Sequence, residues 1–189
     1  MPDLRVIVGY LWAGVGIVWV AGAFTTKSTA RAQPVSSRLL EIALGVGAFA
    51  VGFTKYLKLG LLARPFVPAS PVTAAVGLIL VLAGLGLAVW ARLVLGRNWS
   101  GWVTIKENHT LVRQGPYAIV RHPIYSGLLL AVLGTAIASR ELRVLVATGL
   151  VLLLVCMKLR VEETFMKEEF GAEYTEYQRQ VKTLIPLVW

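Results

Sequence analysis

The stretch His109–Gly127, HTLVRQGPYAIVRHPIYSG, decides how this chain is organised, because a dense polar and basic segment runs directly into a hydrophobic sequence. The chain stays apolar from Leu128 to Ala138, turns at residues 140–143, and is apolar again to Met157 before it reads KLRVEETF. Two polar clusters therefore flank one short hydrophobic hairpin. This pattern predicts a functional site at a membrane surface.

The composition indicates an integral membrane protein. Of the 189 residues, 57% are hydrophobic and the mean hydropathy is +0.70, which exceeds what a soluble core requires. Val6–Phe24 and Pro71–Ala91 carry no charge, and each run is close to the roughly 20 residues that a spanning helix needs. A further span is expected at roughly Leu39–Leu62, and it must accommodate Glu41 near its start.

The apolar runs Ile124–Ala138 and Val144–Met157 are each shorter than a typical spanning helix of roughly 20 residues. A turn with three charged residues, Arg140, Glu141 and Arg143, separates them, so they are interpreted as a helical hairpin. We therefore expect one all-α membrane domain, residues 1–189, with about five transmembrane helices. Residues 1–95 would form three spans, and residues 96–189 the long loop, the hairpin and a tail.

The tail, Glu162–Trp189, alternates glutamates with aromatic residues and predicts an amphipathic helix that is broken near Gly171. Such a helix can lie along the membrane surface and cover a site beneath it. A solvated helix that merely ends the fold agrees equally well with this composition.

Small residues in the first two predicted spans indicate close helix packing. They recur at four-residue spacing in the pairs Gly9/Ala13, Ala43/Gly47 and Ala48/Gly52. Such pairs let helix backbones approach each other in lipid, and a dimer surface is the alternative interpretation.

The net charge of +9 would suggest a nucleic-acid partner in a soluble protein. Here the basic residues lie mostly beside hydrophobic runs, where the positive-inside rule accounts for them, so membrane lipids and no nucleic acid are expected as partners. Placing the loop 92–121 in the cytoplasm also puts the loop 25–38 and the tail there. Arg5, Arg64 and the hairpin turn then lie outside. This orientation places the larger share of the lysines and arginines on the cytoplasmic side.

The residue inventory excludes several chemistries. His109 and His122 are the only histidines, Cys156 is the only cysteine and is interpreted as a packing residue, and no HExxH motif occurs. No metal site is therefore expected. The sequence also has no Walker phosphate loop and no strand-linked GxGxxG, so nucleotide binding of those two kinds has no support.

The two ends of the hairpin carry the residues that are suited to chemistry. They are GPY at 115–117 and RHPIY at 121–125 on the entering side, and Lys158, Arg160, Glu162 and Glu163 on the leaving side. Hairpin geometry brings the two groups together. Aromatic rings can stack on a flat ligand while carboxylates bind ammonium or ribose hydroxyl groups, a combination that suits an amino-acid nucleoside.

Each of these residues also has a purely structural interpretation. The arginines can be headgroup anchors, the tyrosines interfacial belt residues, and His122 a helix-start residue whose ring bonds to backbone. Lys158 and Glu162, four residues apart on a helix, can simply pair at a gain of only about 0.2–0.5 kcal/mol. The joint position of the two clusters across the hairpin favours the functional interpretation.

Four motifs give the chain a family resemblance. They are HTLV at 109–112, GPY at 115–117, RHPIY at 121–125, and an EE pair followed by FGAEYTEY at 170–177. In these motifs, their order and their spacing, the chain resembles the isoprenylcysteine carboxyl methyltransferase family, whose relatives include membrane phospholipid methyltransferases. The similarity covers roughly Trp99–Pro186, whereas the first three spans are similar only in hydrophobicity.

The resemblance implies S-adenosyl-L-methionine as cofactor, bound between the loop and the hairpin. The residues that it implicates are His109, Thr110, Leu111, Val112, Tyr117, Arg121, His122, Pro123, Ile124, Tyr125 and Glu162. It also implies in-line transfer of the sulfonium methyl group to a nucleophile delivered from the bilayer, with catalysis mostly from orientation and water exclusion.

On the catalytic side, the resemblance points to Lys158, Arg160 and Glu163. Where eukaryotic members place an arginine to meet the substrate carboxylate, this chain has Lys158, with Arg160 two residues further on. Lysine keeps the charge but loses the planar fork that binds a carboxylate through two hydrogen bonds, so the acceptor stays open. A carboxylate acceptor needs no base, whereas an ammonium or hydroxyl acceptor would lose a proton to Glu163, Tyr117 or His122.

The sequence therefore predicts a membrane methyltransferase that acts on a lipophilic small-molecule or lipidated substrate, with the carboxylate of an isoprenylcysteine-like molecule as one acceptor. One alternative is a membrane reductase that uses NADPH. The other is a lipid-binding scaffold without catalysis, in which the polar clusters serve only as anchors.

Overall fold

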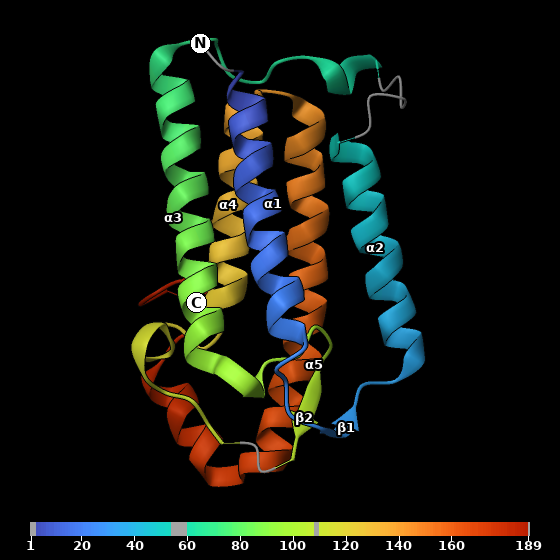
Figure 1. Cartoon of the computed structure of the whole chain (residues 1–189), viewed down its shortest axis with the longest axis vertical. Helices are drawn as coiled ribbons and strands as arrows, with labels where there is room; N and C mark the ends of the chain where they lie inside the picture. The colour runs from blue at the N-terminus through green and yellow to red at the C-terminus, as the bar shows by residue number, and fades with distance from the viewer. Residues whose placement is uncertain (1–2, 54–59, 108–109, 189) are drawn as a thin grey trace.

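Five helices run along the long axis of the molecule (Figure 1) in residues 3–53, 60–107 and 110–188, which the computed structural model describes. They are α1 Leu4–Ala23, α2 Val35–Phe53, α3 Pro71–Leu95, α4 Pro123–Ser139 and α5 Leu142–Gln180. Four of them are long and apolar enough to cross a membrane, and α4 is apolar but shorter. The chain is a multi-pass integral membrane protein.

The first and third helices cover the uncharged runs that predicted them, but the bounds predicted for the second span are wrong. α2 begins at Val35, directly after Pro34, and not near Leu39. At the predicted far end, Gly60–Ala63 forms a separate short 3-10 helix, η1, and residues 54–59 lie outside the described part of the chain. Glu41, which the predicted span also had to accommodate, is buried in α2, and its carboxylate has a hydrogen-bond partner inside the protein.

The prediction of an entirely helical fold misses a two-stranded sheet. The strand β1, Thr29–Ala32, pairs antiparallel with β2, Thr104–Lys106, and joins the two loops at the polar end of the bundle. Gln33 N continues the pairing by donating to the Val103 carbonyl at 3.0 Å. Strands of three or four residues are too short for an alternating pattern to identify them.

The predicted hairpin is present, with α4 and α5 packed against each other. Its turn is tight because Arg140 adopts a left-handed conformation with φ of 63°. The turn is held by the loop before α3, where Phe66 N donates to the Arg140 carbonyl at 2.9 Å and Leu142 N donates to the Arg64 carbonyl at 3.1 Å.

The closest helix contact lies between α3 and α4, and glycines make it possible. A Cβ atom on Gly84 would lie 2.5 Å from the Gly127 carbonyl oxygen, and one on Gly134 would lie 2.7 Å from the Val81 nitrogen. Because neither glycine has a side chain, the two backbones touch and gain dispersion contacts that lipid does not supply.

The small-residue pairs that the sequence singled out do not make this contact. Cβ atoms on Gly9 and Gly47 would meet nothing within 4 Å, so the packing predicted there is wrong. Of these pairs, only Ala48/Gly52 packs closely against another helix. Ala48 is buried, and a Cβ on Gly52 would lie 2.9 Å from the Ala147 side chain of α5. Four-residue spacing alone does not reveal which face of a lipid-exposed helix has a neighbour.

The fifth helix continues past the membrane core into the tail without a loop. The break expected near Gly171 is confirmed, because this residue has φ of 53° inside α5 and turns the last segment of the helix. As a result, the tail, β1, β2 and the start of α4 gather at one end of the bundle, and the hairpin turn lies at the other end (Figure 1).

We predict that Gly84→Ala destabilises the protein by about 1–3 kcal/mol, because the added methyl group must push α3 and α4 apart. Thermal unfolding in detergent measures the effect. Gly86→Ala is the matched control, because its Cβ would meet nothing within 4 Å while the gain in helix propensity is the same. Equal unfolding temperatures for the two variants would contradict the close contact.

Candidate functional site

A cavity of about 290 Å³ lies at the end of the bundle that carries the tail. Ten residues that the sequence implicated line it, and they come from the loop after β2, the start of α4 and the polar part of α5. They are Thr110, Leu111, Val112, Tyr117, Arg121, His122, Ile124, Tyr125, Lys158 and Glu162. The two polar clusters flanking the hairpin thus share one cavity.

Three other predicted residues, Pro123, Arg160 and Glu163, do not form this wall. Pro123 is fully buried in the first turn of α4, and Arg160 is exposed. Glu163 lies behind the wall with its carboxylate engaged by neighbouring side chains. His109 lies outside the described residues.

Glu162 and the first turn of α4 form the polar corner of the cavity. Tyr125 donates its hydroxyl hydrogen to Glu162 Oε2 at 2.9 Å. The His122 ring stacks beside Tyr125, with 5.9 Å between ring centroids, and its Nδ1 lies 3.8 Å from Glu162 Oε2. His122 precedes α4, but its ring does not cap the helix. The corner therefore offers a carboxylate beside two ring faces.

Glu163 is the centre of a hydrogen-bond network behind that corner. Arg121 donates to it through Nε and Nη2 at 3.0 and 3.2 Å, and His122 Nε2 lies 2.7 Å from Oε1. Because an ionised carboxylate only accepts, His122 Nε2 carries the hydrogen in this contact. Tyr174 and Gln178 donate to the same carboxylate from beyond the Gly171 break. Glu163 thus fastens the tail to the start of α4.

The segment after α5 returns along the loop before α4 and fastens it a second time. Arg121 N donates to the Lys182 carbonyl at 2.8 Å, and His122 N donates to the Thr183 carbonyl at 3.1 Å. Ser126 Oγ donates to the Leu184 carbonyl at 2.7 Å. The tail is therefore a structural part of the site.

The other side of the cavity is closed by the short 3-10 helix η3, Gly115–Ala118. Its Tyr117 is buried, and Tyr177 of the tail donates its hydroxyl hydrogen to the Tyr117 carbonyl. Burial, reinforced by the nearby Glu162 carboxylate, raises the pKa of Tyr117 far above its ordinary value. The Tyr117 hydroxyl therefore stays neutral at physiological pH.

Several lining residues were missed by sequence reasoning. Trp19 comes from α1, Asn98 and Trp99 come from the segment between α3 and β2, and Thr104 is the first residue of β2. Asn98 Oδ1 and Thr104 Oγ are buried atoms without a hydrogen-bond partner inside the described protein. The available signal was a pair of tryptophans, Trp99 and Trp102, flanked by these two polar residues, but no motif marked it. Both oxygens can accept hydrogen bonds from a ligand.

Lys158 lines the cavity but is already paired. Its Nζ lies 3.4 Å from Glu41 Oε2 and donates to the Gly101 carbonyl at 3.1 Å. Glu41, which is 7% exposed, also accepts from Gln33 Nε2 at 2.7 Å, and Gln33 is held by the Val103 backbone. The lysine therefore carries a fixed counter-charge contributed by α2.

The comparisons with known sequences are consistent with this arrangement. The sequence model of the phospholipid methyltransferase family matches residues 72–173, more than half of the chain. Protein-S-isoprenylcysteine O-methyltransferase B of Arabidopsis thaliana is 31% identical over 115 residues, which cover 59% of this chain and 58% of the plant protein. The cobalt-zinc-cadmium resistance protein CzcN of Cupriavidus metallidurans is 32% identical over 111 residues, or 58% of this chain and 50% of that protein.

A solved structure is also similar. It is that of a eukaryotic intramembrane Ras methyltransferase, isoprenylcysteine carboxyl methyltransferase, which matches with a TM-score of 0.57 and 26% sequence identity. The match covers 82% of this chain and 54% of that chain. The chain thus spans between half and three fifths of the length of these relatives.

We predict that Glu163→Gln destabilises the tail, because buried Arg121 loses its counter-charge, at a cost of about 3–5 kcal/mol. Hydrogen exchange followed by mass spectrometry should show faster exchange in residues 172–184. Glu168→Gln is the control, because Glu168 pairs with Arg31 where both side chains are about half exposed. Such pairs contribute only about 0–1 kcal/mol. Similar exchange in the two variants would refute the fastening role of Glu163.

Proposed function

The chain belongs to the phospholipid methyltransferase family, and on that premise we propose that it transfers a methyl group from S-adenosyl-L-methionine to a lipophilic acceptor at the membrane surface. The family consists of S-adenosylmethionine-dependent methyltransferases. The observation that carries the proposal is the single cavity in which residues 110–112, the first turn of α4 and Glu162 of α5 meet. A carboxylate, ring faces and apolar walls in one cavity suit an amino-acid nucleoside with a charged sulfur.

The residues of the cavity fit this cofactor by their chemistry. The Glu162 carboxylate would bind the ammonium group or a ribose hydroxyl, and the rings of Tyr117 and Tyr125 would flank the base. The oxygens of Asn98 and Thr104 that have no partner within the described protein would accept further hydrogen bonds. When bound, S-adenosylmethionine supplies an electrophilic methyl group. The protein contributes binding, orientation and exclusion of water.

The surroundings narrow the choice of a base for an acceptor that must lose a proton. Tyr117 stays neutral because its pKa is raised, and a neutral phenol is a poor base. Both oxygens of Glu163 already accept hydrogen bonds, so we assign it a positioning role. Of the three groups considered, His122 remains as the candidate base. It would accept the proton at Nδ1, the atom that faces Glu162.

We also propose that all five helices cross the bilayer and that the site and the tail face the cytoplasm. With 17 residues, α4 is at the lower end of the roughly 17–25 residues that span a bilayer. The loops at the site end carry the larger share of lysines and arginines, which the positive-inside rule assigns to the cytoplasm.

Calorimetry on the purified full chain tests cofactor binding, and we expect one S-adenosylmethionine per protein. Glu162→Gln should weaken binding by about tenfold, or roughly 1.4 kcal/mol, because a hydrogen bond to a charged group is lost. Arg179→Gln is the control, since Arg179 is exposed at the end of α5. Absent binding, or binding of NADPH in its place, would overturn the assignment.

A second experiment identifies the acceptor. The protein is incubated with labelled cofactor and a lipid extract, and the labelled product shows which lipid was methylated.

For the acceptor, we propose the carboxylate of an isoprenylcysteine-like molecule, with Lys158 as its cationic partner. Lys158 is the cation in the cavity wall on the same helix as Glu162, one turn closer to the bilayer core. A carboxylate that approaches Lys158 has to compete with Glu41 for the ammonium group. Arg160, two residues further on and exposed, is proposed to meet the acceptor from outside the cavity.

Glu41→Gln tests this competition. The neutral amide still accepts from Gln33 but no longer neutralises Lys158, so KM for an S-farnesylcysteine carboxylate should fall by about tenfold, or roughly 1.4 kcal/mol. The affinity for S-adenosylmethionine, measured in parallel, should not change. Lys158→Met in the Glu41→Gln background should reverse the gain. An unchanged or higher KM with intact cofactor binding would eliminate Lys158 as the carboxylate partner.

A further inference from the structure

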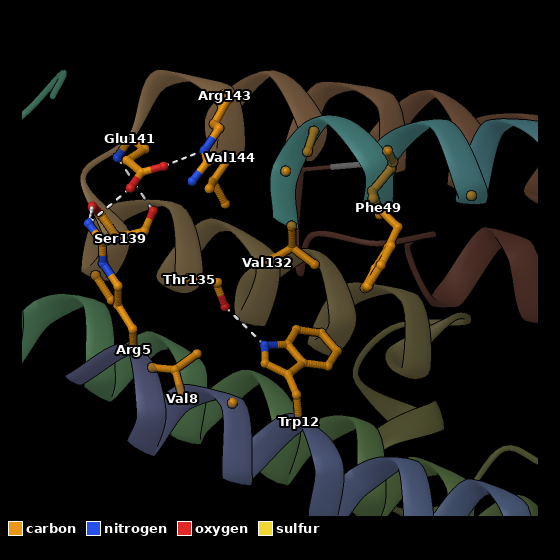
Figure 2. Close-up of a pocket in the computed structure, with 17 residues that line it drawn as sticks. Arg5, Val8, Trp12, Phe49, Val132, Thr135, Ser139, Glu141, Arg143 and Val144 are labelled. Carbon is orange, nitrogen blue, oxygen red and sulfur yellow. Dashed lines mark hydrogen bonds and ion pairs between the residues drawn. The ribbon is translucent and has the colours of Figure 1, made fainter. Parts of the chain in front are cut away.

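A second and larger cavity, of about 620 Å³, lies toward the other end of the bundle, where residues from α1, α2, α4 and α5 line it. Figure 2 shows that charged side chains gather at one end of this cavity, around Glu141, and that the rings of Trp12 and Phe49 lie at the other end. Ligand pockets commonly measure roughly 300–1,000 Å³. The cavity is therefore large enough for a bound molecule.

The deep part of the cavity offers almost only apolar contacts. Trp12 Nε1 donates to Thr135 Oγ at 3.0 Å, and that hydroxyl donates to the Ala131 carbonyl at 2.8 Å, so these polar groups are satisfied by each other. Gly9 of α1 and Gly45 of α2 both line the cavity, and Cβ atoms on them would meet nothing within 4 Å. This part of the cavity therefore suits an apolar group.

The charged end has a different character. Glu141 accepts from Arg5 at 2.9 Å and from Arg143 Nε, so two guanidinium groups share one carboxylate. The Arg5 side chain is 55% exposed. The cluster has a net charge of +1, which favours an anion at the mouth of the cavity.

We propose that this cavity binds one membrane lipid with an anionic headgroup. Its phosphate contacts Arg5 and Arg143, and one acyl chain lies between α1 and α2 beside Trp12. The charged mouth lies at Glu141, at the start of α5, whereas the methyl-transfer cavity lies at Glu162, beyond the apolar segment of that helix. The bound lipid therefore belongs to the leaflet opposite the methyl-transfer site and is not the methyl acceptor.

Native mass spectrometry of the full chain, released from detergent micelles, tests this site. Phosphatidylglycerol and phosphatidylcholine with identical acyl chains are added in equal amounts. We expect one retained phosphatidylglycerol, at about tenfold higher occupancy than phosphatidylcholine, because each tenfold preference needs only about 1.4 kcal/mol from the headgroup contact. Equal retention of the two lipids would refute the anionic site.

Two classes of variant distinguish the contribution of the lipid's acyl chain from that of its headgroup. Gly45→Leu fills the apolar part and should reduce retention of both lipids, whereas Gly47→Leu, two residues along α2 and outside the cavity wall, should behave as the wild type. Arg5→Gln should remove the preference for phosphatidylglycerol without removing lipid binding. Wild-type retention by Gly45→Leu would place any bound lipid elsewhere and overturn the proposal. If Gly45→Leu aggregates, Gly9→Leu makes the same test from α1.

Discussion

The site depends on the placement of one carboxylate, that of Glu163, at the point where the membrane helices end. Arg121 and His122 approach it from the start of α4, and Tyr174 and Gln178 approach it from the tail. Because these donors come from segments about 40 residues before it and up to 15 residues after it, one anion fixes three parts of the chain. A partly buried charge with this many donors is strongly held, since removing it leaves the partner charges without compensation.

Much of this arrangement follows from local sequence. The hairpin could be predicted because Arg140, Glu141 and Arg143 interrupt two apolar runs, and the break in α5 because Gly171 tolerates a left-handed conformation. The grouping of the two polar clusters then followed from hairpin geometry. These features rest on contacts between neighbours in the sequence, or on a single reversal of the chain.

The features that could not be predicted rest on contacts between distant segments. Glu41 was recognised only as a charge to be accommodated in α2, and its pairing with Lys158 depends on how α2 packs against α5. Trp19 enters the site from the end of α1, where Arg92 of α3 donates to the Gly22 carbonyl at 2.7 Å and the Trp19 ring contacts Trp99. The glycines between α3 and α4 were unremarkable in sequence because small residues are frequent in membrane helices.

The length of α5 has a consequence of its own. From Leu142 to Gly171 it is one rigid rod that carries the bilayer-embedded segment and, further along, Glu162 and Glu163. Helices adapt to hydrophobic mismatch by tilting, and a tilt of this rod would displace both glutamates relative to the first turn of α4. Bilayer thickness, and with it the lipid composition of the membrane, is therefore expected to alter the geometry of the end of the bundle that holds the proposed methyl-transfer site.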